Sequence, residues 1–478
     1  MPSPDPKPVL LLIRRDLRLA DHPALAAALA LGRPVIAAFL HDETMEELGA
    51  AARWRFGLGL AEFARNLEGI GGRLILRRGD AGREIAKLVA QTGADTVYWS
   101  RAYDPASVKR DSAIKSDLKA QGIEAKSFSG HLIFEPWDVE TGQGGPYRVY
   151  TPYWKAVRGR PVAPALPAPT SWPAPKVWPV SEALEDWAMG AKMRRGADVV
   201  ARFAQVGEAA ARDRLHRFLD SRVARYKDNR DFPDHAATSG LSENLTYGEI
   251  SPRMIWHAGW AAMERGEGGT QGPEHFLKEL VWREFAWHLL YHYPDLAVKC
   301  WKPDWEQFAW RGDSPQAEAW RQGRTGEPFV DAAMREMFVT GTMHNRARMI
   351  VGSYLTKHLL TDWRVGRAWF DDCLIDWDPA ANAMGWQWVA GCGPDASPFF
   401  RIFNPATQAE KFDPQSAYRS RFIAEGHRAA HPDALAYFDA VPQAWKLAAT
   451  AKYPAPIVAL DQGRARALDA LQAMKTVT

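Results

Sequence analysis

Residues 376–405 read DWDPAANAMGWQWVAGCGPDASPFFRIFNP, a stretch that mixes paired acids, an amide and two indoles with an arginine between phenylalanines. A plain hydrophobic core does not need polar side chains such as Asp376, Asn382 and Arg401. Amides, indoles and an arginine around one pocket would suit a flat ring with polar edges. The alternative is a Trp-rich helical core, because aromatic stripes usually indicate packing.

A second polar block lies upstream, where residues 343–349 read MHNRARM. Asn345 and Met349 are four residues apart and therefore share one face of a helix, whereas Arg346 points away from that face. These residues would place an amide and a thioether beside the same pocket.

Glu279 begins a third block, which continues as WREFAWHL at residues 282–289. Glu279 and Trp282 are three residues apart and share a helical face. Arg283 is four residues from Glu279, so a simple ion pair between the two is the alternative to a functional role.

The first 130 residues alternate apolar runs with amphipathic segments, which predicts a doubly wound parallel sheet with helices on both faces, similar to a Rossmann fold. No GxGxxG motif follows the first predicted strand, so usual NAD binding is not expected. RRDLRLADHPAL, residues 14–25, takes that place. It is either a solvated basic loop that Asp21 caps into a helix or a segment with a direct role. The predicted strands are residues 9–13, 34–40, 74–76, 96–99 and 125–128, and the predicted helices are 24–31, 50–67, 82–90 and 105–121.

The chain is expected to contain an α/β domain at residues 1–134, a linker at 135–198 and a large all-α domain at 199–478. The linker contains RPVAPALPAPTSWPAPKVWP, which is rich in proline, lacks periodicity and should lie extended over the surface. The aromatic residues of YRVYTPYWKAV, just before it, are expected to pack the linker against a domain. Beyond residue 199 a helical period is visible at 201–217 and 275–291.

The composition indicates a soluble cytoplasmic protein. A formal charge of +3 and a pI near 8.6 are only mildly basic, so any nucleic-acid contact must come from a local patch. Cys300, Cys373 and Cys392 lack disulfide-like spacing and are too few for an iron–sulfur cluster, and no metal site is expected. The N-terminal apolar run is too short for a signal peptide or a membrane span, so no membrane association is expected.

The blocks MHNRARM, GWQW, FFRIFNPATQ and WREFAWHL together resemble the DNA photolyase/cryptochrome family of flavoproteins, and they occur in the family's order. RRDLRLADHPAL resembles the family's first motif. The resemblance implies an FAD-binding enzyme, most like a bacterial photolyase, that uses light to split cyclobutane pyrimidine dimers in UV-damaged DNA. It also implies a monomer.

The resemblance assigns a set of residues to FAD. Asn382 would face N5 of the isoalloxazine ring, where its amide can accept a hydrogen bond from a protonated N5. The loop at residues 238–242 precedes a helical pattern and would bind the diphosphate, although helix capping alone would explain its hydroxyl groups. The full set is Tyr226, Thr238, Ser239, Gly240, Leu241, Ser242, Phe276, Glu279, Arg283, Asn345, Asp376, Asp378 and Asn382.

The resemblance also assigns residues to the lesion, to electron transfer and to DNA. Glu279, Asn345, Met349, Trp282 and Trp388 would contact the dimer, and the absence of histidine at Asn345 and Met349 favours cyclobutane dimers over (6-4) photoproducts. Trp310, Trp363 and Trp386 would pass electrons from the surface to the flavin. Trp369 and Trp377 are either core residues or a second electron route. Arg230, Arg346, Arg401 and Gln408 would contact DNA around the cleft.

The sequence leaves a second, antenna chromophore undecided. Folate-binding relatives have an acid where Asp104 lies, but the matching cationic position is Val298. Deazaflavin-binding relatives use an acid near Asp42, but the second acid falls at Ala102. Folate (MTHF), 8-hydroxy-5-deazaflavin and no antenna all remain open.

Two other functions remain open from sequence. A cryptochrome would sense blue light with the same fold and flavin but without repair. A helical nucleic-acid-binding module would explain the arginines but would leave GWQW and Asn382 without a role.

Overall fold

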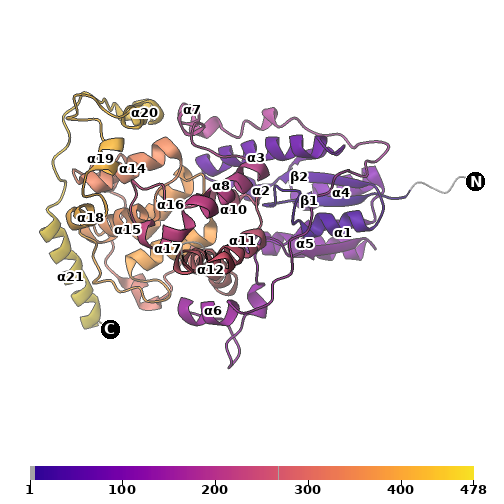
Figure 1. The fold of residues 1–478 in the computed structure, drawn as a ribbon, viewed down its shortest axis with the longest axis horizontal. Helices are drawn as coiled ribbons and strands as arrows, with labels where there is room; N and C mark the ends of the chain where they lie inside the picture. Colours follow the sequence, from indigo (N-terminus) through magenta and orange to yellow (C-terminus); the bar gives the residue numbers. More distant parts are fainter. Residues whose placement is uncertain (1–5, 267–268, 478) are drawn as a thin grey trace, which may run out of the picture.

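The computed structural model describes residues 6–266 and 269–477 of the 478-residue chain. Its N-terminal part contains a five-stranded sheet with the order β3-β2-β1-β4-β5, in which neighbouring strands are parallel. The strands are β1 (Val9–Ile13), β2 (Val35–His41), β3 (Leu74–Arg78), β4 (Thr96–Ser100) and β5 (Glu124–Phe128). The predicted doubly wound parallel sheet is therefore confirmed, and Figure 1 shows it at one end of the molecule, opposite the C-terminal helix.

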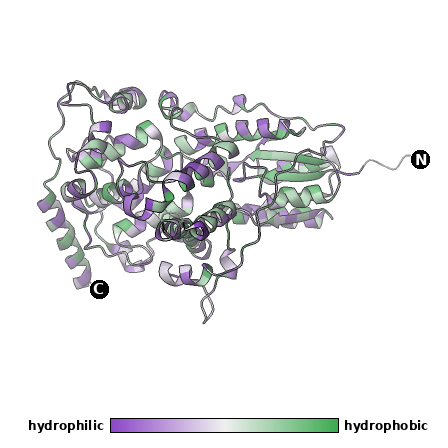
Figure 2. Ribbon diagram, in the orientation of Figure 1, coloured by the Kyte–Doolittle hydropathy of each residue, from purple (hydrophilic) through white to green (hydrophobic). Residues whose placement is uncertain are grey.

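Helices cover both faces of the sheet because successive side chains of a strand point to opposite faces. Val9, Leu11 and Ile13 pack with α1 (Pro23–Ala30) and α3 (Ala50–Glu68). Leu10 and Leu12 pack with α4 (Ala81–Thr92) and α5 (Pro105–Ala120). Burial on both faces explains why the strand VLLLI is apolar throughout, as the hydropathy colours of Figure 2 show for the sheet.

The segment between β1 and α1 is buried, so the expectation of a solvated loop is wrong. Asp21 does not cap α1; its backbone has φ 50° and its carboxylate pairs with Arg253. The N-cap is His22, whose Nδ1 accepts a hydrogen bond from the backbone three residues on. Arg18, which is 1% exposed, donates to the backbone oxygen of Gly248 at 2.9 Å. These residues connect the α/β part to the helical part.

The linker is anchored to both parts of the molecule. Residues 160–179 contain no helix or strand, as predicted. Trp172 in this segment is buried, and its Nε1 donates to the backbone oxygen of Val35 at 2.9 Å. The aromatic residues of α6 (Tyr150–Val157) share one hydrophobic cluster with α12 (Gln271–His292), which agrees with the expected packing role.

The rest of the chain is mostly helical. The helical period predicted from residue 201 begins later than expected, because Gly207 has φ 94° and α8 begins at Glu208. The remaining helices are α2 (Glu43–Glu46), α7 (Gly196–Val200), α8 (Glu208–Ser221), α9 (Tyr226–Asn229), α10 (Ser242–Thr246), α11 (Pro252–Arg265), α13 (Pro315–Arg321), α14 (Pro328–Thr340), α15 (Asn345–Ser353), α16 (Trp363–Cys373), α17 (Pro379–Ala390), α18 (Pro405–Phe412), α19 (Ala417–Phe422), α20 (Pro432–Ala440) and α21 (Leu460–Val477), with a π-helical turn at Tyr354–His358. Short 3-10 turns lie at Pro136–Asp138, Glu185–Trp187, Ala191–Met193, Val223–Arg225, Pro294–Ala297, Pro303–Gln307 and Gln443–Trp445.

A buried ion cluster joins α3 to α10. Arg55 on α3 is fully buried and donates to Glu243 at 2.6 Å and to both carboxylate oxygens of Glu249 at 2.8 and 2.9 Å. Glu243 directly follows Ser242, the first residue of α10. The cluster therefore positions the loop at residues 238–242 relative to the sheet. Among the described residues, no helix is both long and apolar enough to cross a membrane.

Candidate functional site

Asp376 and Asp378, just before α17, accept hydrogen bonds from several different elements of the fold. Oδ1 of Asp378 caps α17 by accepting hydrogen bonds from the N–H groups of Ala380 and Ala381, at 3.0 and 2.8 Å. Its Oδ2 accepts from Nε1 of Trp287 on α12 at 2.9 Å. Asp378 therefore joins α12 to α17, and these two helices carry six of the sixteen residues predicted for the flavin and the lesion.

Asp376 joins two further elements. Its carboxylate accepts two hydrogen bonds from Nη2 of Arg348, at 2.8 and 2.9 Å, and one from Oγ of Ser242 at 2.8 Å. The predicted diphosphate loop, α15 and the start of α17 thus meet at one carboxylate. Sequence reasoning missed Arg348, although it lies within the MHNRARM block beside Asn345 and Met349.

Tyr226 and Phe276 form an aromatic wall beside this loop. Their ring centroids are 6.0 Å apart in an edge-on arrangement, and Tyr226 is buried. Burial raises the pKa of the Tyr226 hydroxyl. Thr238 and Ser239 are half-buried and Gly240 is exposed, while Leu241 is buried.

The predicted lesion and DNA residues are connected by a continuous run of ion pairs. Glu279 pairs with Arg230, Arg230 lies 3.9 Å from Asp231, and Oδ2 of Asp231 accepts from Arg346 at 2.5 Å. Glu279 therefore does not form the alternative pair with Arg283. Nη1 of Arg283 instead donates to the backbone oxygen of His131 at 3.0 Å, and Arg283 pairs with the neighbouring Glu284.

Aromatic rings support the other predicted lesion contacts. Trp282 stacks on Tyr150 with ring centroids 3.6 Å apart and planes 7° apart. Trp388 and Met349 are half-buried, and Asn345 is exposed at the first turn of α15. The sequence predicted only a packing role for Tyr150, so its contact with Trp282 was missed, as Arg348 was.

The remaining predicted DNA contacts lie on α18 and the segment before it. Arg346 lies over the ring of Phe412 at 4.4 Å, which connects α15 to α18. Gln408 is on α18, and its Oε1 is buried without a hydrogen-bond partner in the described structure. Arg401 is exposed, and its backbone oxygen accepts from Nζ of Lys357 at 2.8 Å.

The three predicted electron-transfer indoles belong to one hydrophobic cluster but differ in burial. Trp363 and Trp386 are buried, whereas Trp310 is partly exposed. Nε1 of each is buried and has no hydrogen-bond partner in the described residues. Trp369 packs on Phe338 and Trp445, and Trp377 donates from Nε1 to Asp371.

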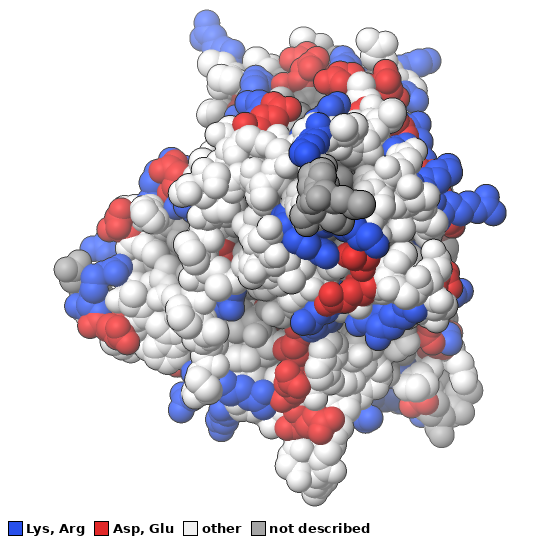
Figure 3. Space-filling view, turned by 90° about the vertical axis from the view of Figure 1, so that its right-hand side faces the viewer, with Lys and Arg blue, Asp and Glu red and all other residues white. Residues whose placement is uncertain are grey.

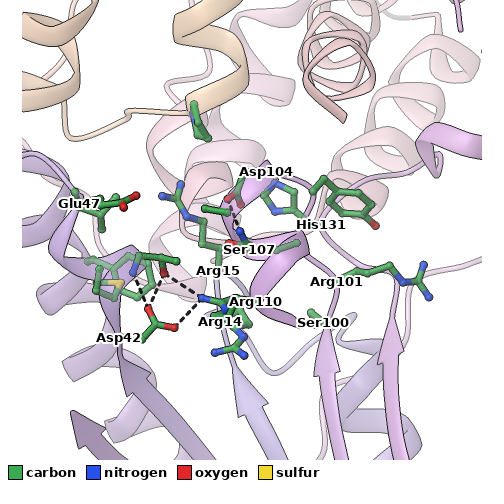
Figure 4. A pocket seen from close by; sticks show the side chains of 18 of the residues that line it. Arg14, Arg15, Asp42, Glu47, Ser100, Arg101, Asp104, Ser107, Arg110 and His131 are labelled. Atoms are coloured by element: carbon green, nitrogen blue, oxygen red, sulfur yellow. Dashed lines mark hydrogen bonds and ion pairs between the residues drawn. The ribbon is translucent and has the colours of Figure 1, made fainter. Parts of the chain in front are cut away.

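A cavity of about 270 Å³ lies at the carboxyl ends of β1, β2 and β4 (Figure 4). The chain leaves β1 for β2 on one side and reaches β4 on the other, so this is the topological switch point where open α/β sheets bind ligands. Asp42 pairs there with Arg110 at 2.8 Å, and Asp104 caps α5. Burial and Arg283 hold the pKa of His131 well below its usual value, so this side chain is neutral. The polar lining residues are Arg14, Arg15, Asp42, Thr44, Glu47, Ser100, Arg101, Tyr103, Asp104, Ser107, Arg110 and His131.

The polar groups around the 238–242 loop and Asp376 fit FAD. Hydroxyl groups of the 238–242 loop suit a diphosphate. The Arg348–Asp376 pair provides a hydrogen-bond donor and an acceptor that suit the polar edge of an isoalloxazine ring. Gly385, three residues after Asn382 on α17, faces open space, since an added Cβ would meet no atom within 4 Å. In the described parts of the chain, no group of three or more His, Cys, Asp or Glu residues is placed to hold a metal ion.

Comparisons with known proteins agree with this geometry. Residues 9–173 match the family model described as DNA photolyase, and residues 276–473 match the FAD binding domain of DNA photolyase. A deoxyribodipyrimidine photo-lyase of Agrobacterium fabrum is 46% identical over 98% of this chain and 99% of its own length. The crystal structure of a bacterial class III photolyase from Agrobacterium tumefaciens has a TM-score of 0.92 at 45% identity, covering 99% of both chains. An archaeal photolyase from Sulfolobus tokodaii, described with two FAD molecules and a novel light-harvesting cofactor, has a TM-score of 0.80 at 27% identity over 98% of this chain and all of its own.

Proposed function

The chain belongs to the DNA photolyase family, and from this premise we propose that it is a deoxyribodipyrimidine photo-lyase, which uses light and FAD to split cyclobutane pyrimidine dimers in UV-damaged DNA. The observation that carries this proposal is the run of ion pairs Glu279–Arg230–Asp231–Arg346. It joins a carboxyl group suited to a base with arginines suited to phosphates in one network of ion pairs. We further propose that the protein acts as a cytoplasmic monomer.

The lesion contacts have distinct roles in this proposal. The chemistry that bound, reduced FAD supplies is light-driven electron transfer to the dimer and back. Glu279 hydrogen-bonds the dimer; in its protonated form its O–H donates to the carbonyl oxygen on which negative charge develops. Asn345 holds both bases in register, and Met349 fills the space beside the ring. Trp282, supported from behind by Tyr150, and Trp388 enclose the flipped dimer.

Arginines at the cleft edge position the DNA without reading its sequence. Arg230, Arg346, Arg401 and Gln408 contact the DNA strand around the cleft. Lesion preference begins with the weakened stacking of a dimer, since flipping a dimer costs less than flipping two sound bases, for which on the order of a few kcal/mol is typical. Figure 3 shows basic and acidic side chains interspersed on the face formed by the α/β end, which favours DNA binding elsewhere.

We assign FAD to the helical domain, held by Tyr226, Phe276, the 238–242 loop, Asp376, Asp378 and Asn382. Trp386, Trp363 and Trp310 carry electrons from the surface to this site.

We place a second chromophore in the cavity at the switch point between β1 and β4. Both Asp42 and Asp104 line it, so the position is compatible with either a folate or a deazaflavin. Denaturing the purified protein and identifying the released chromophores by absorbance and mass tests this placement. Recovery of FAD alone from several preparations would contradict it.

The function is tested by illuminating chemically pre-reduced protein with a dimer-containing oligonucleotide and measuring the recovery of thymine absorbance. We expect repair by the wild type, and a lower yield per photon for Glu279→Gln with FAD still bound. A hydrogen bond to a developing charge contributes at most about 2–4 kcal/mol here, because back electron transfer competes. No recovery with cyclobutane dimers would favour a cryptochrome, and recovery only with (6-4) lesions would show that Asn345 and Met349 were misjudged.

A further inference from the structure

Three side chains converge on the carboxylate of Asp371, an α16 residue to which neither the sequence nor the proposed mechanism assigns a role. Its Oδ1 accepts a hydrogen bond from Nδ2 of Asn382 at 2.7 Å and another from Nε1 of Trp377. Its Oδ2 lies 3.6 Å from Nε of Arg367, one turn earlier on the same helix. Asn382 is the residue assigned to N5 of the flavin, so Asp371 lies directly behind it.

Both amide hydrogens of Asn382 are used within the protein. Nδ2 donates to Asp371 and also, at 3.3 Å, to the backbone oxygen of Arg367. An asparagine side chain has two N–H donors and one carbonyl oxygen. Turning the amide over would bring its oxygen against a carboxylate and a carbonyl, neither of which can donate. None of the hydrogen bonds within residues 6–266 and 269–477 ends on Oδ1 of Asn382, so the oxygen is the free end of the side chain.

We propose that Asp371 is a positioning residue that makes Asn382 present only its carbonyl oxygen to the flavin ring. This inference rests on the proposed function, through the assignment of Asn382 to N5. An amide in this orientation accepts a hydrogen bond from a protonated N5 but has no hydrogen to donate to an unprotonated one. Asp371 therefore favours the flavin states that carry a proton at N5.

The α/β domain keeps Asp371 in place. Helix α3 begins directly against α16, and a Cβ added to Gly49 would lie only 2.0 Å from the backbone oxygen of Asp371. The N–H of Ala50 donates to Asp372 at 2.9 Å. Trp377, the second donor to Asp371, lines the cavity at the switch point and lies under Arg15. The orientation of the amide thus depends on contacts across the domain boundary.

The test uses full-length, FAD-loaded protein without DNA. After one-electron photoreduction, visible absorption distinguishes a flavin that is protonated at N5 from one that is not, and the ratio is followed as a function of pH. Asp371→Leu removes the acceptor and lets the amide turn. We expect the unprotonated fraction at a given pH to increase about tenfold, as the loss of one net hydrogen bond allows.

The matched control is Asp372→Asn, which removes the charge of the neighbouring carboxylate but keeps an Oδ1 that can accept from the Ala50 N–H. It does not contact Asn382, and we expect it to titrate like the wild type. If Asp371→Leu does not retain FAD, the isosteric Asp371→Asn replaces it, with a smaller shift expected in the same direction. Wild-type titration of both Asp371 variants would overturn the proposal. So would loss of FAD from both, because Asp371 would then build the site instead of orienting the amide. Failure of the repair assay with a normal Asp371 response would reject the proposed function alone.

Discussion

A single acidic side chain holds two of the arginines that we propose to contact DNA. Arg346 and Arg230 both lie beside Asp231, a carboxylate that would compete with a phosphate for these arginines in the proposed DNA complex. The arginines are therefore held in position, and their affinity for any phosphate is reduced by the same contact. Asp231 should consequently matter most for DNA that offers no lesion contacts.

We expect Asp231→Asn to bind undamaged duplex DNA a few-fold more tightly and with a steeper salt dependence, because one more arginine is free for a phosphate. Binding to dimer-containing DNA should change less. Titrations at two salt concentrations measure both effects. Asp234→Asn, a nearby acid whose recorded partner is His235, serves as the control. Equal tightening by both variants would mean that only net charge matters.

At the scale of elements, the linker supports a predicted lesion contact through α6. Tyr150 on this helix stacks on Trp282 of α12, and its hydroxyl donates to the backbone oxygen of Lys278 at 2.6 Å. One face of the indole is thus covered by Tyr150, and we propose that the base stacks on the opposite face.

Tyr150→Ala should weaken binding of dimer-containing DNA, since an aromatic pair contributes about 0.5–1.5 kcal/mol beyond its buried area, or a few-fold to tenfold in affinity. Tyr150→Phe keeps the ring and should bind like the wild type. Affinity for a dimer-containing oligonucleotide checks this, with FAD content measured in parallel. Equal weakening in the Phe variant would assign the effect to the hydroxyl group.

The turn between β1 and α1 gives a pH-dependent prediction. Burial alone would raise the pKa of Asp16. Its neighbours nevertheless lower this pKa to about 2: Nε2 of His22 lies 3.1 Å from Oδ2 of Asp16, and the Ser100 hydroxyl and the Arg14 N–H donate hydrogen bonds to the carboxylate. Ionised Asp16 therefore stabilises the fold above its unfolded pKa, and this contribution is lost as pH falls from about 4 to about 2.

Asp16→Asn should unfold more easily than the wild type at neutral pH by about 2 kcal/mol, which is the free energy of such a shift. Urea unfolding between pH 7 and pH 3 measures this difference, and it should begin to shrink below about pH 4. A difference that does not depend on pH would point to lost packing and not to the charge.

At the scale of the whole molecule, the α/β part and the helical part meet through buried charges, and these charges are next to the predicted diphosphate loop. Arg55 faces two carboxylates, Glu243 and Glu249, and all three are almost fully buried. Removing one partner of such a cluster leaves uncompensated charge in the interior.

Arg55→Met should lower the free energy of unfolding by about 3–5 kcal/mol and reduce FAD retention, because Glu243 is adjacent to Ser242. Arg65→Met, on the exposed side of the same helix, should change stability by no more than about 0.5 kcal/mol. Denaturant unfolding and FAD content after gel filtration measure both outcomes. Unchanged FAD retention in a clearly destabilised Arg55→Met would show that the loop does not depend on this cluster.

The local part of the structure could be predicted from the sequence. The strand VLLLI and the alternating helices follow from apolar periodicity within a few residues, and the family followed from four short blocks in order. The extended linker was predicted from its prolines. The domain boundaries and the roles of the individual site residues stay predictions.

Contacts between distant residues were decided only by the tertiary structure. Asp21 was expected to cap a helix, but it pairs with Arg253, 232 residues away in sequence. Arg348 meets Asp376, Tyr150 meets Trp282, and Asp371 meets an asparagine on the next helix. A short polar side chain satisfies its hydrogen bonds with whichever groups the fold brings near, and its neighbours in sequence do not specify those groups. The sequence alone therefore determined which chemistry is present, and the packing of distant helices decided which residues act together.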